Sequence, residues 1–355
     1  MVPDELRPNE KEMFNMQLRM ATLSQQLFWA LTLAAVAFVS TSRASDKEYG
    51  VYEFVVRKAQ GTFDHATSGL QDAAGKSGWL VVATVDAGKM DGCGYNARVL
   101  ILCDTSYAKS IIEANPRTGP FAVLDRINLF QDEDGMHVSV VNPHSINRTV
   151  LLDDTKYEQM TETHLQALRA MISSAVNGEE SRKQYGEIRD KGYIGKTMGV
   201  VAGGPFNDKL EDEFVIPGST PAEVAAKVEK ALGKEGKEWG TRCVFNLPLP
   251  AFQTHILGVS GTPLDTQSFE IVGSGDDDDR DSFKCPGLAH AAAYPFELVI
   301  VKEGNDCKVR MVTPMFRMKM FFEDAGKWAF MKHMGMPGSI AGEVTDRIKA
   351  ELNAQ

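Results

Sequence analysis

Short alternating runs of apolar and polar residues, separated by helical stretches, dominate the chain between residues 46 and 177. Alternation with a period of two predicts half-buried strands, and apolar residues spaced by three and four predict helices. Asp134-Gly135 gives the clearest turn signal, because glycine supplies the positive φ of a hairpin turn. The expected order is strand 52–56, helix 65–74, strands 79–85 and 97–102, helix 107–114, strands 126–130 and 136–141, and helix 156–176.

The pattern between residues 208 and 355 follows a similar order. Its first helix begins at Thr220-Pro221 with Glu223 next, which is a capping box with proline in the first turn. Gly304-Asn305 marks a second hairpin turn. The expected order is strand 213–216, a helix that ends at Gly233, strands 241–246, 256–259 and 269–272, hairpin strands 296–301 and 308–312, and helix 339–352.

A strand, a helix, several antiparallel strands and a closing helix are typical of an α+β fold with helices on one face of the sheet. Two such units predict tandem α+β repeats, 46–177 and 208–355, that form a pseudo-dimer within one chain. Residues 178–207 are rich in glycine and charge and are expected to be the linker. The chain is 43% apolar and 24% charged, which is normal for a globular protein and argues against disorder.

Two stretches carry a resemblance to a known family. They are VLILCDTSYAKSIIEANPRTGPFAVLDRINLFQDEDGMHVSVVNP and CPGLAHAAAYPFELVIVKEGNDCKVRMVTPMFRMKMFF. Both resemble the bacterial domain of unknown function 302 family, where a Cys-Asn-Pro-like motif precedes a short helix and a Pro-Cys-Arg-like strand entry precedes an acidic hairpin. The resemblance implies a TATA-box-binding-protein-like α+β fold and a tendency to pair, and it brings no established reaction. At the Pro-Cys-Arg position this chain has Leu124-Asp125-Arg126 and Tyr294-Pro295-Phe296, so no thiol is implied there.

The first 44 residues differ from the rest of the chain. Residues 27–39 form an uncharged apolar run of 13, preceded by Lys11 and Arg19 and followed by Ser42-Arg43-Ala44. This is the layout of a secretory signal peptide. The run is too short to cross a bilayer, which takes about 20 residues as a helix. We therefore predict a signal peptide at 1–44, a periplasmic location and no membrane span after cleavage, with an uncleaved anchor as the alternative.

The charge of the chain argues against one class of partner. Lys and Arg number 38 and Asp and Glu number 48, which gives a net charge of −10. Removal of residues 1–44 takes away equal numbers of acidic and basic residues and leaves this charge unchanged. Proteins bind nucleic acid mainly by neutralising its phosphates with Lys and Arg. We therefore expect no nucleic-acid partner.

All five cysteines follow the predicted signal peptide, and export permits disulfides. Because five is odd, at least one thiol is unpaired or bonded to another molecule. Cys103 and Cys285 are expected at equivalent places before helix starts, where the helix N-terminus lowers the pKa of a thiol. They are weak catalytic candidates for a thiol-dependent redox or sulfur-relay enzyme. The alternative is a set of buried, inert thiols with one disulfide.

Methionine is concentrated near the end of the chain. Of 16 methionines, seven fall within residues 311–336. Thioether and imidazole groups suit soft metals, above all Cu(I), and Met318 and Met320 share a face if they lie on a strand. The alternative is that methionine fills the core or forms an adaptable contact surface. The candidate ligands for copper or a haem-like cofactor are Met315, Met318, Met320, Met331, His333, Met334 and Met336.

Together these features predict an exported, soluble binding or accessory protein rather than an enzyme. Its expected ligand is a soft metal, a haem-like cofactor or another small molecule, held by the second repeat or between the repeats. One alternative is the thiol-dependent enzyme that uses Cys103 or Cys285. Another is a structural partner of an envelope complex that uses the methionine surface, and a homo-oligomer is also open.

Overall fold

A computed structural model describes residues 48–151, 157–189, 203–273 and 284–354. The chain divides into two compact units, Met1–Asp46 and Lys47–Gln355, and all described residues belong to the second unit. The predicted signal peptide 1–44 therefore lies outside the described residues. Within the described ranges, no helix has the length and apolar character needed to cross a membrane.

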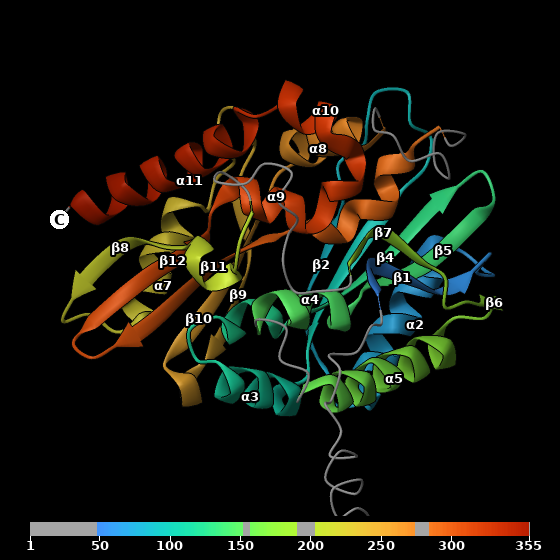
Figure 1. The fold of residues 1–355 in the computed structure, drawn as a ribbon, viewed down its shortest axis with the longest axis horizontal. Coiled ribbons are helices and arrows are strands. Elements are labelled where there is room, and N and C mark those ends of the chain that lie inside the picture. Colours follow the sequence, from blue (N-terminus) through green and yellow to red (C-terminus); the bar gives the residue numbers. More distant parts are fainter. Residues whose placement is uncertain (1–47, 152–156, 190–202, 274–283, 355) are drawn as a thin grey trace, which may run out of the picture. The chain divides into compact units, whose positions relative to one another are not determined.

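The first half contains an antiparallel sheet of order β2-β3-β4-β5-β1-β6, with β7 also paired to β1 (Figure 1). Helices α2 (Phe63–Lys76) and α5 (Glu158–Ala175) pack together on one face of this sheet. Leu70 and Leu168 from these helices share a buried cluster with Leu100 and Ile127 from the sheet. The strands are β1 (Tyr49–Arg57), β2 (Leu80–Asp86), β3 (Ala97–Cys103), β4 (Asp125–Asp132), β5 (Gly135–Val141), β6 (Glu179–Glu180) and β7 (Gln184–Arg189).

The second half contains a five-stranded antiparallel sheet of order β9-β10-β11-β12-β8. Helices α7 (Pro221–Ala231) and α11 (Met336–Asn353) pack together beside it (Figure 1). The capping box of Thr220 and Glu223 at the start of α7 is confirmed. The strands are β8 (Leu210–Pro217), β9 (Arg242–Leu249), β10 (Thr254–Ser260), β11 (Phe296–Glu303) and β12 (Asp306–Val312).

The two sheets share details beyond their strand order. The first strand of each half carries one extra residue against the strand it pairs with, Val55 in β1 against β5 and Glu213 in β8 against β12. Bulges of this kind bend a strand at a defined place. The first helix of each half begins after a threonine N-cap, Thr62 or Thr220. Corresponding positions in the two halves can therefore be read from the elements themselves.

Shorter helices complete each half. In the first half they are α3 (Thr105–Ala114), η1 (Gly119–Ala122) and α4 (Pro143–Val150). In the second half they are η4 (Phe206–Lys209), η5 (Pro250–Phe252), α8 (Thr262–Gly273), η6 (Pro286–Ala293), α9 (Pro314–Phe322), η7 (Glu323–Ala325) and α10 (Gly326–Lys332).

The expected α+β class is confirmed, with two antiparallel sheets. The strand expected at 269–272 is wrong, because these residues belong to helix α8. Phe269 and Val272 are buried there together with Leu264, and a short apolar run does not distinguish a buried helix from a strand. Part of the expected linker 178–207 is also ordered structure, since β6 and β7 pair with β1.

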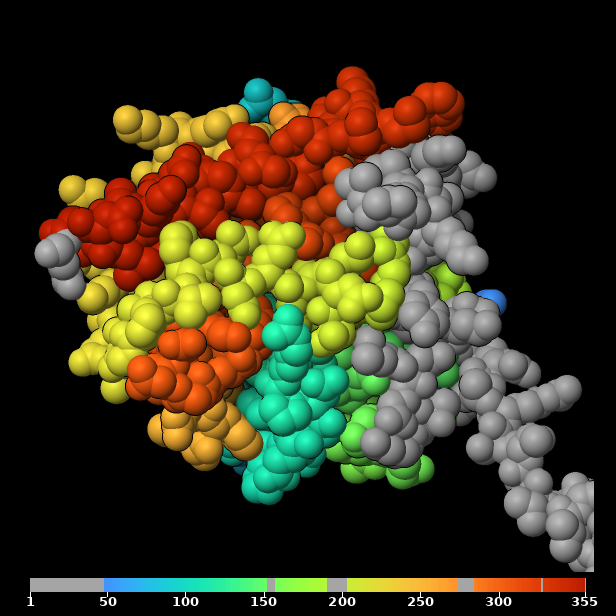
Figure 2. All heavy atoms as spheres, turned by 60° about the vertical axis from the view of Figure 1, so that its left-hand side comes forward, coloured from blue at the N-terminus to red at the C-terminus, as the bar shows by residue number. Residues whose placement is uncertain are grey.

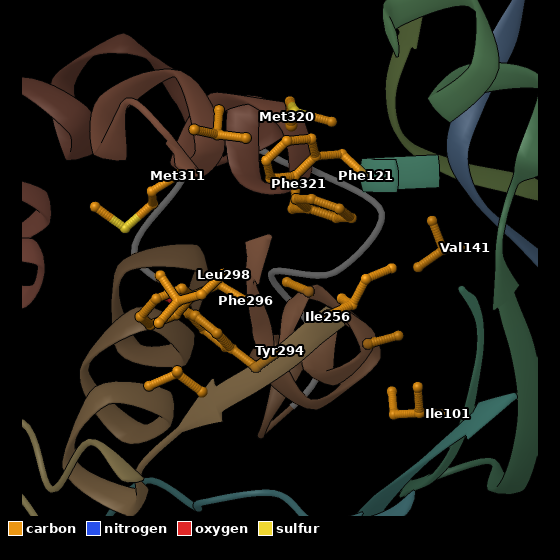
Figure 3. Close-up of a cluster of buried hydrophobic side chains, with 14 of the residues drawn as sticks. Ile101, Phe121, Val141, Ile256, Tyr294, Phe296, Leu298, Met311, Met320 and Phe321 are labelled. Atoms are coloured by element: carbon orange, nitrogen blue, oxygen red, sulfur yellow. The ribbon is translucent and has the colours of Figure 1, made fainter. Parts of the chain in front are cut away.

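The halves meet over the sheet face that α2 and α5 leave open. Segment η6 packs on β3, β4 and β5 of the first half, and η1 packs on β11 of the second. Side chains of both halves form one buried cluster (Figure 3), and the teal chain around η1 lies against the second half in Figure 2. A disulfide between Cys93 and Cys285 also joins the halves.

One buried ion pair connects equivalent positions across this contact. Arg126 lies six residues before the end of β4, and Glu297 lies six residues before the end of β11. The Arg126 guanidinium donates to the Glu297 carboxylate. The two halves therefore contact each other through corresponding strand positions.

Candidate ligand pocket

A pocket opens in the second half between the β11–β12 hairpin and helices α8, α9 and α11. It encloses about 440 Å³, including the part open to solvent. Small-molecule sites are typically concave and mainly apolar, with a few placed polar groups. The lining residues are Leu264, Tyr294, Phe296, Glu297, Met311, Val312, Pro314, Arg317, Met318, Pro337, Ile340 and Ala341.

Helix α9 positions two of these side chains, Arg317 and Met318. The helix begins at Pro314 after Thr313, and proline suits the first turn because its fixed φ is already helical. All its residues from Met315 to Phe322 are buried, so this part of the helix has no exposed face. Such a helix is held by packing on every side.

Charged groups form one wall of the pocket. Arg317 Nε lies 3.4 Å from Glu297 Oε2, and Arg317 Nη2 donates to the carbonyl of Ala293. The same Glu297 carboxylate accepts from Arg126, which also donates to the Ala292 carbonyl at 3.1 Å. Burial lowers the pKa of Arg126, because the charged guanidinium loses its hydration.

Tyr294 brings a hydroxyl to the pocket. Its Oη lies 2.8 Å from Ser268 Oγ and donates to Met318 Sδ at 3.4 Å. Burial raises the pKa of Tyr294, so the hydroxyl stays protonated at neutral pH. The Met318 thioether therefore acts here as a hydrogen-bond acceptor beside the pocket.

The structure divides the predicted metal ligands between two environments. Met315, Met318, Met320 and Met336 are buried in the core. Met331 and Met334 are 41% and 53% exposed, and His333 between them caps α10.

The condition under which Met318 and Met320 would share a face is not met, because both lie on helix α9 and not on a strand. Residues two apart on a helix point about 200° apart. In the described part of the chain, no group of three or more His, Cys, Asp or Glu side chains is placed to hold a metal. The copper and haem assignments stay predictions.

The structure separates the two thiol candidates. Cys103 ends β3 and is buried, and burial together with the Asp125 and Asp104 carboxylates raises its pKa to about 12. The expected lowering of its pKa by a helix N-terminus is therefore wrong. Cys285 precedes η6 and is bonded to Cys93, so it carries no thiol here. The residue equivalent to Cys103 is Ser260 at the end of β10, and the expected equivalence with Cys285 is also wrong.

The corresponding space in the first half is filled by polar side chains. Asp125 is the first residue of β4, as Phe296 is of β11. Tyr107 is the third residue of α3, as Leu264 is of α8. Asn147 is the fifth residue of α4, as Met318 is of α9. When the buried residues Leu168 and Ile172 of α5 are matched to Val344 and Ile348 of α11, His164 corresponds to Ile340. Four polar residues thus correspond to four apolar ones.

These four polar side chains bond to one another. His164 Nε2 lies 2.7 Å from Asp125 Oδ1, and Trp79 Nε1 donates to Asp125 Oδ2 at 3.0 Å. Tyr107 stacks on the His164 ring with 3.6 Å between centroids, and Asn147 donates to the Tyr107 hydroxyl at 2.6 Å. Burial lowers the pKa of His164, but the Asp125 carboxylate outweighs this and the net shift is upward.

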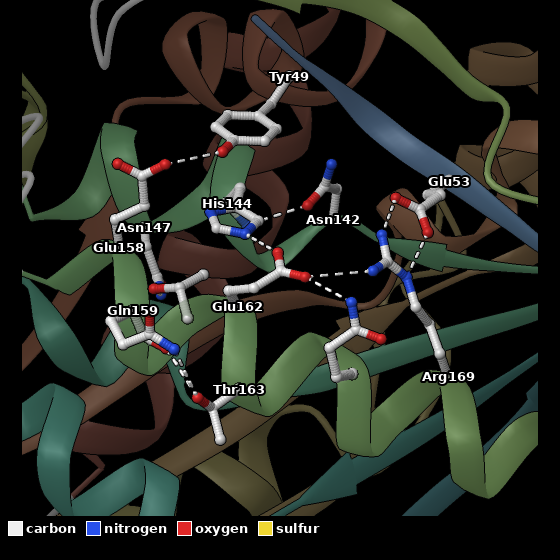
Figure 4. A network of polar contacts seen from close by, with 12 residues as sticks. Tyr49, Glu53, Asn142, His144, Asn147, Glu158, Gln159, Glu162, Thr163 and Arg169 are labelled. Carbon is white, nitrogen blue, oxygen red and sulfur yellow. Dashed lines mark hydrogen bonds and ion pairs between the residues drawn. The ribbon is translucent and has the colours of Figure 1, made fainter. Parts of the chain in front are cut away.

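A second polar group lies beside it, toward α5 (Figure 4). The His144 ring stacks on Tyr49, and its Nε2 lies 2.7 Å from Glu162 Oε2. Arg169 lies 3.5 Å from Glu162 and donates twice to Glu53, at 2.6 Å each. Burial lowers the pKa of His144. The side chains of this second group therefore bond to one another and link α4, α5 and β1.

Sequence reasoning missed the charged wall of the pocket. Arg126, Glu297 and Arg317 each interrupt an apolar run, as in LDRINLF, PFELVIV and PMFRMKM. A charge at an otherwise buried position is a signal, because such groups are rarely buried unless paired. Their pairing could not be read from the sequence, since Arg126 and Glu297 lie 171 positions apart.

Comparison with solved structures gives matches to part of the chain. No family model matches the chain, and no curated protein does. A crystal structure of an uncharacterized conserved protein of the DUF302 family from Bacillus stearothermophilus is similar to part of it, with 12% sequence identity and a TM-score of 0.29. The match covers 36% of this chain and 97% of that one. That neighbour belongs to the family that the sequence resembles, and the TM-score is too low to carry an argument about fold or function.

Proposed function

We propose that the protein binds a small, mainly apolar ligand in the pocket of the second half. The observation that supports this is the contrast at equivalent positions. Leu264, Phe296, Met318 and Ile340 line an open apolar space, whereas their counterparts in the first half are bonded together. An apolar pocket with a few convergent polar groups is the usual form of a small-molecule site.

The chemistry of the walls favours binding over catalysis. Glu297 is engaged by two guanidinium groups, and the hydroxyl of Tyr294 has a raised pKa. General acid–base catalysis needs a group whose pKa lies near the working pH. Cys103 is buried with a pKa of about 12 and does not line this pocket. The pocket is therefore proposed as a binding site, not an active site.

The setting of this activity is also a proposal. The layout of residues 1–44 supports export, which would place the binding protein in the periplasm. The shared strand order, the shared extra residues Val55 and Glu213 and the two threonine N-caps support a tandem duplication of one DUF302-like unit. The second copy would then have become the ligand-binding one.

A matched pair of variants on α11 tests the site. Ala341 lines the pocket, whereas Ala350 is exposed on the same helix. Calorimetric titration with 1-octanol and octanoate should show saturable binding of at least one probe to the native protein. Ala341→Leu should weaken that binding at least tenfold, and Ala350→Leu should not. Absence of saturable binding of both probes, or equal binding by the two variants, would overturn the proposal.

Exposure of Met331 and Met334 favours a second candidate, a Cu(I) site at the end of α10. Met331 and Met334 reach solvent on either side of His333, and these are soft or borderline ligands. Competition with a Cu(I) chelator should give an affinity that falls in Met331→Leu/Met334→Leu and not in the control Met315→Leu, whose side chain is buried in α9. Equal affinities in the two variants would exclude this site.

A further inference from the structure

We infer that the ligand of the second-half pocket carries an anionic group, and that this group binds Arg317. The inference rests on the proposed function and names the chemical class of its ligand. The expected ligand is an apolar monocarboxylate, with its hydrocarbon part against Leu264, Phe296 and Ile340 and its carboxylate against Arg317.

The charges at the pocket wall do not balance. Arg126 is 2% exposed, and Arg317 and Glu297 are each 8% exposed. Both guanidinium groups pair with the single Glu297 carboxylate, and neither forms another ion pair with a residue that the structure describes. One positive charge is therefore in excess in a buried place. Buried charges are costly unless they are paired, so a ligand that supplies a negative charge gains from this arrangement.

Arg317 keeps a donor for that ligand. Its Nε and Nη2 are engaged by Glu297 and the Ala293 carbonyl, and its Nη1 makes no hydrogen bond to any described residue. Arg317 lines the pocket, and its side chain is 10% exposed. A guanidinium fits a carboxylate well in charge and geometry.

The Arg317 group is held in place before a ligand arrives. Its guanidinium lies 3.9 Å from the centroid of the Phe321 ring. Stacking of this kind fixes the plane of a guanidinium and leaves its edge available for hydrogen bonds. Arg126 does not line the pocket and is bonded to Ala292 and Ala293, so Arg317 is the group that meets the ligand.

The rest of the pocket fits an apolar body. Apart from Arg317, Glu297 and Tyr294, its lining is hydrocarbon or thioether. The first half has Ile146 at the position of Arg317, since each is the fourth residue of its helix, α4 or α9. An anion site is therefore expected only in the second half.

The test compares two probes of equal chain length, octanoate and 1-octanol, by calorimetric titration of the full chain at low salt. A carboxylate bound by a charged donor should make octanoate bind roughly 10- to 100-fold more tightly than 1-octanol. Arg317→Met should reduce this ratio to near one, and Arg317→Lys should keep part of it. Arg317→Met leaves Arg126 and Glu297 as a balanced pair, and its thermal unfolding serves as the check that it folds.

The outcomes separate the two proposals. If Ala341→Leu weakens the binding of 1-octanol but octanoate binds no more tightly than 1-octanol, the anionic ligand is excluded. The proposal that the pocket binds an apolar ligand is then still supported. If octanoate is preferred equally by native protein and folded Arg317→Met, the assignment of Arg317 is wrong. If neither probe binds, the proposed function fails together with this inference.

Discussion

The same location in the two halves holds opposite chemistry. Between the first sheet and helices α4 and α5, Asp125, His164 and Tyr107 bond and stack against one another. Between the second sheet and helices α9 and α11, Phe296 and Ile340 line an open pocket. Strand order and bulges are shared, so the backbone does not set this difference. Side-chain chemistry decides whether the space becomes a bonded interior or an open pocket.

The largest effect should come from the charged wall. Glu297→Gln leaves the guanidiniums of Arg126 and Arg317 buried without their shared carboxylate. We expect a loss of about 3–5 kcal/mol of unfolding free energy, the usual range when a buried ion pair loses one partner. Urea denaturation measures it, with the solvent-exposed Glu235→Gln as control. A loss no larger than in that control would mean that Glu297 does not hold the wall together.

The second-largest loss of stability should come from a change in the polar interior of the first half, and its size should depend on pH. Because the folded pKa of His164 is raised by Asp125, the pair stabilises the protein most below the unfolded histidine pKa, about 6.5. That contribution is lost as pH rises through the folded pKa. Asp125→Asn should cost about 2–3 kcal/mol at pH 6 and less at pH 8. Urea denaturation of both proteins across this range measures the difference, and a cost that is equal at both pH values would contradict the role given to the pair.

A smaller loss of stability should follow when a residue of the first half is replaced by its counterpart from the second half. Asn147→Met removes the donor to the Tyr107 hydroxyl and to Thr161 Oγ1. The expected cost is about 1–2 kcal/mol, because the lost hydrogen bonds are buried and neutral. Thermal unfolding measures this change. The exposed Gln159→Met on α5 is the control, and a neutral Asn147→Met would show that the polar cluster is not a unit.

The smallest effect should be a gain in stability. Leu165 in α5 corresponds to Ala341 in α11, one residue after the matched pair His164 and Ile340. Ala341→Leu should therefore stabilise the ligand-free protein by about 0.5–1 kcal/mol, since it fills the pocket as the first half is filled. Differential scanning calorimetry compares it with Ala350→Leu. A lower melting temperature for Ala341→Leu would show that the pocket cannot accept the larger side chain.

Local signals made much of the fold predictable. Thr220, Pro221 and Glu223 define a helix start by their own hydrogen bonds, and Asp134-Gly135 defines a turn. Short apolar runs inside helices gave no such signal. The buried run around Phe269 was predicted as a strand, and no helix was predicted over the residues of α9.

The candidate pocket was predictable only in part. The methionine-rich segment led to Met318, which lines the pocket, but not to the charged groups beside it. Arg126, Glu297 and Arg317 come together from two sheets and a helix, and the contact between Arg126 and Glu297 forms only where the two halves pack. A spacing rule cannot find a site whose members are distant in the chain.

The pairing of Arg126 with Glu297 has a consequence for how such a protein can evolve. In a symmetric dimer of identical units, residues near the twofold axis meet their own copies, so an arginine there faces an arginine. A single chain with two unequal halves escapes this restriction, because each side of the contact can mutate alone. Opposite charges at equivalent positions make each half complementary to the other and a poor partner for a copy of itself. Covalent linkage thus allows one half to specialise while the other maintains the pair.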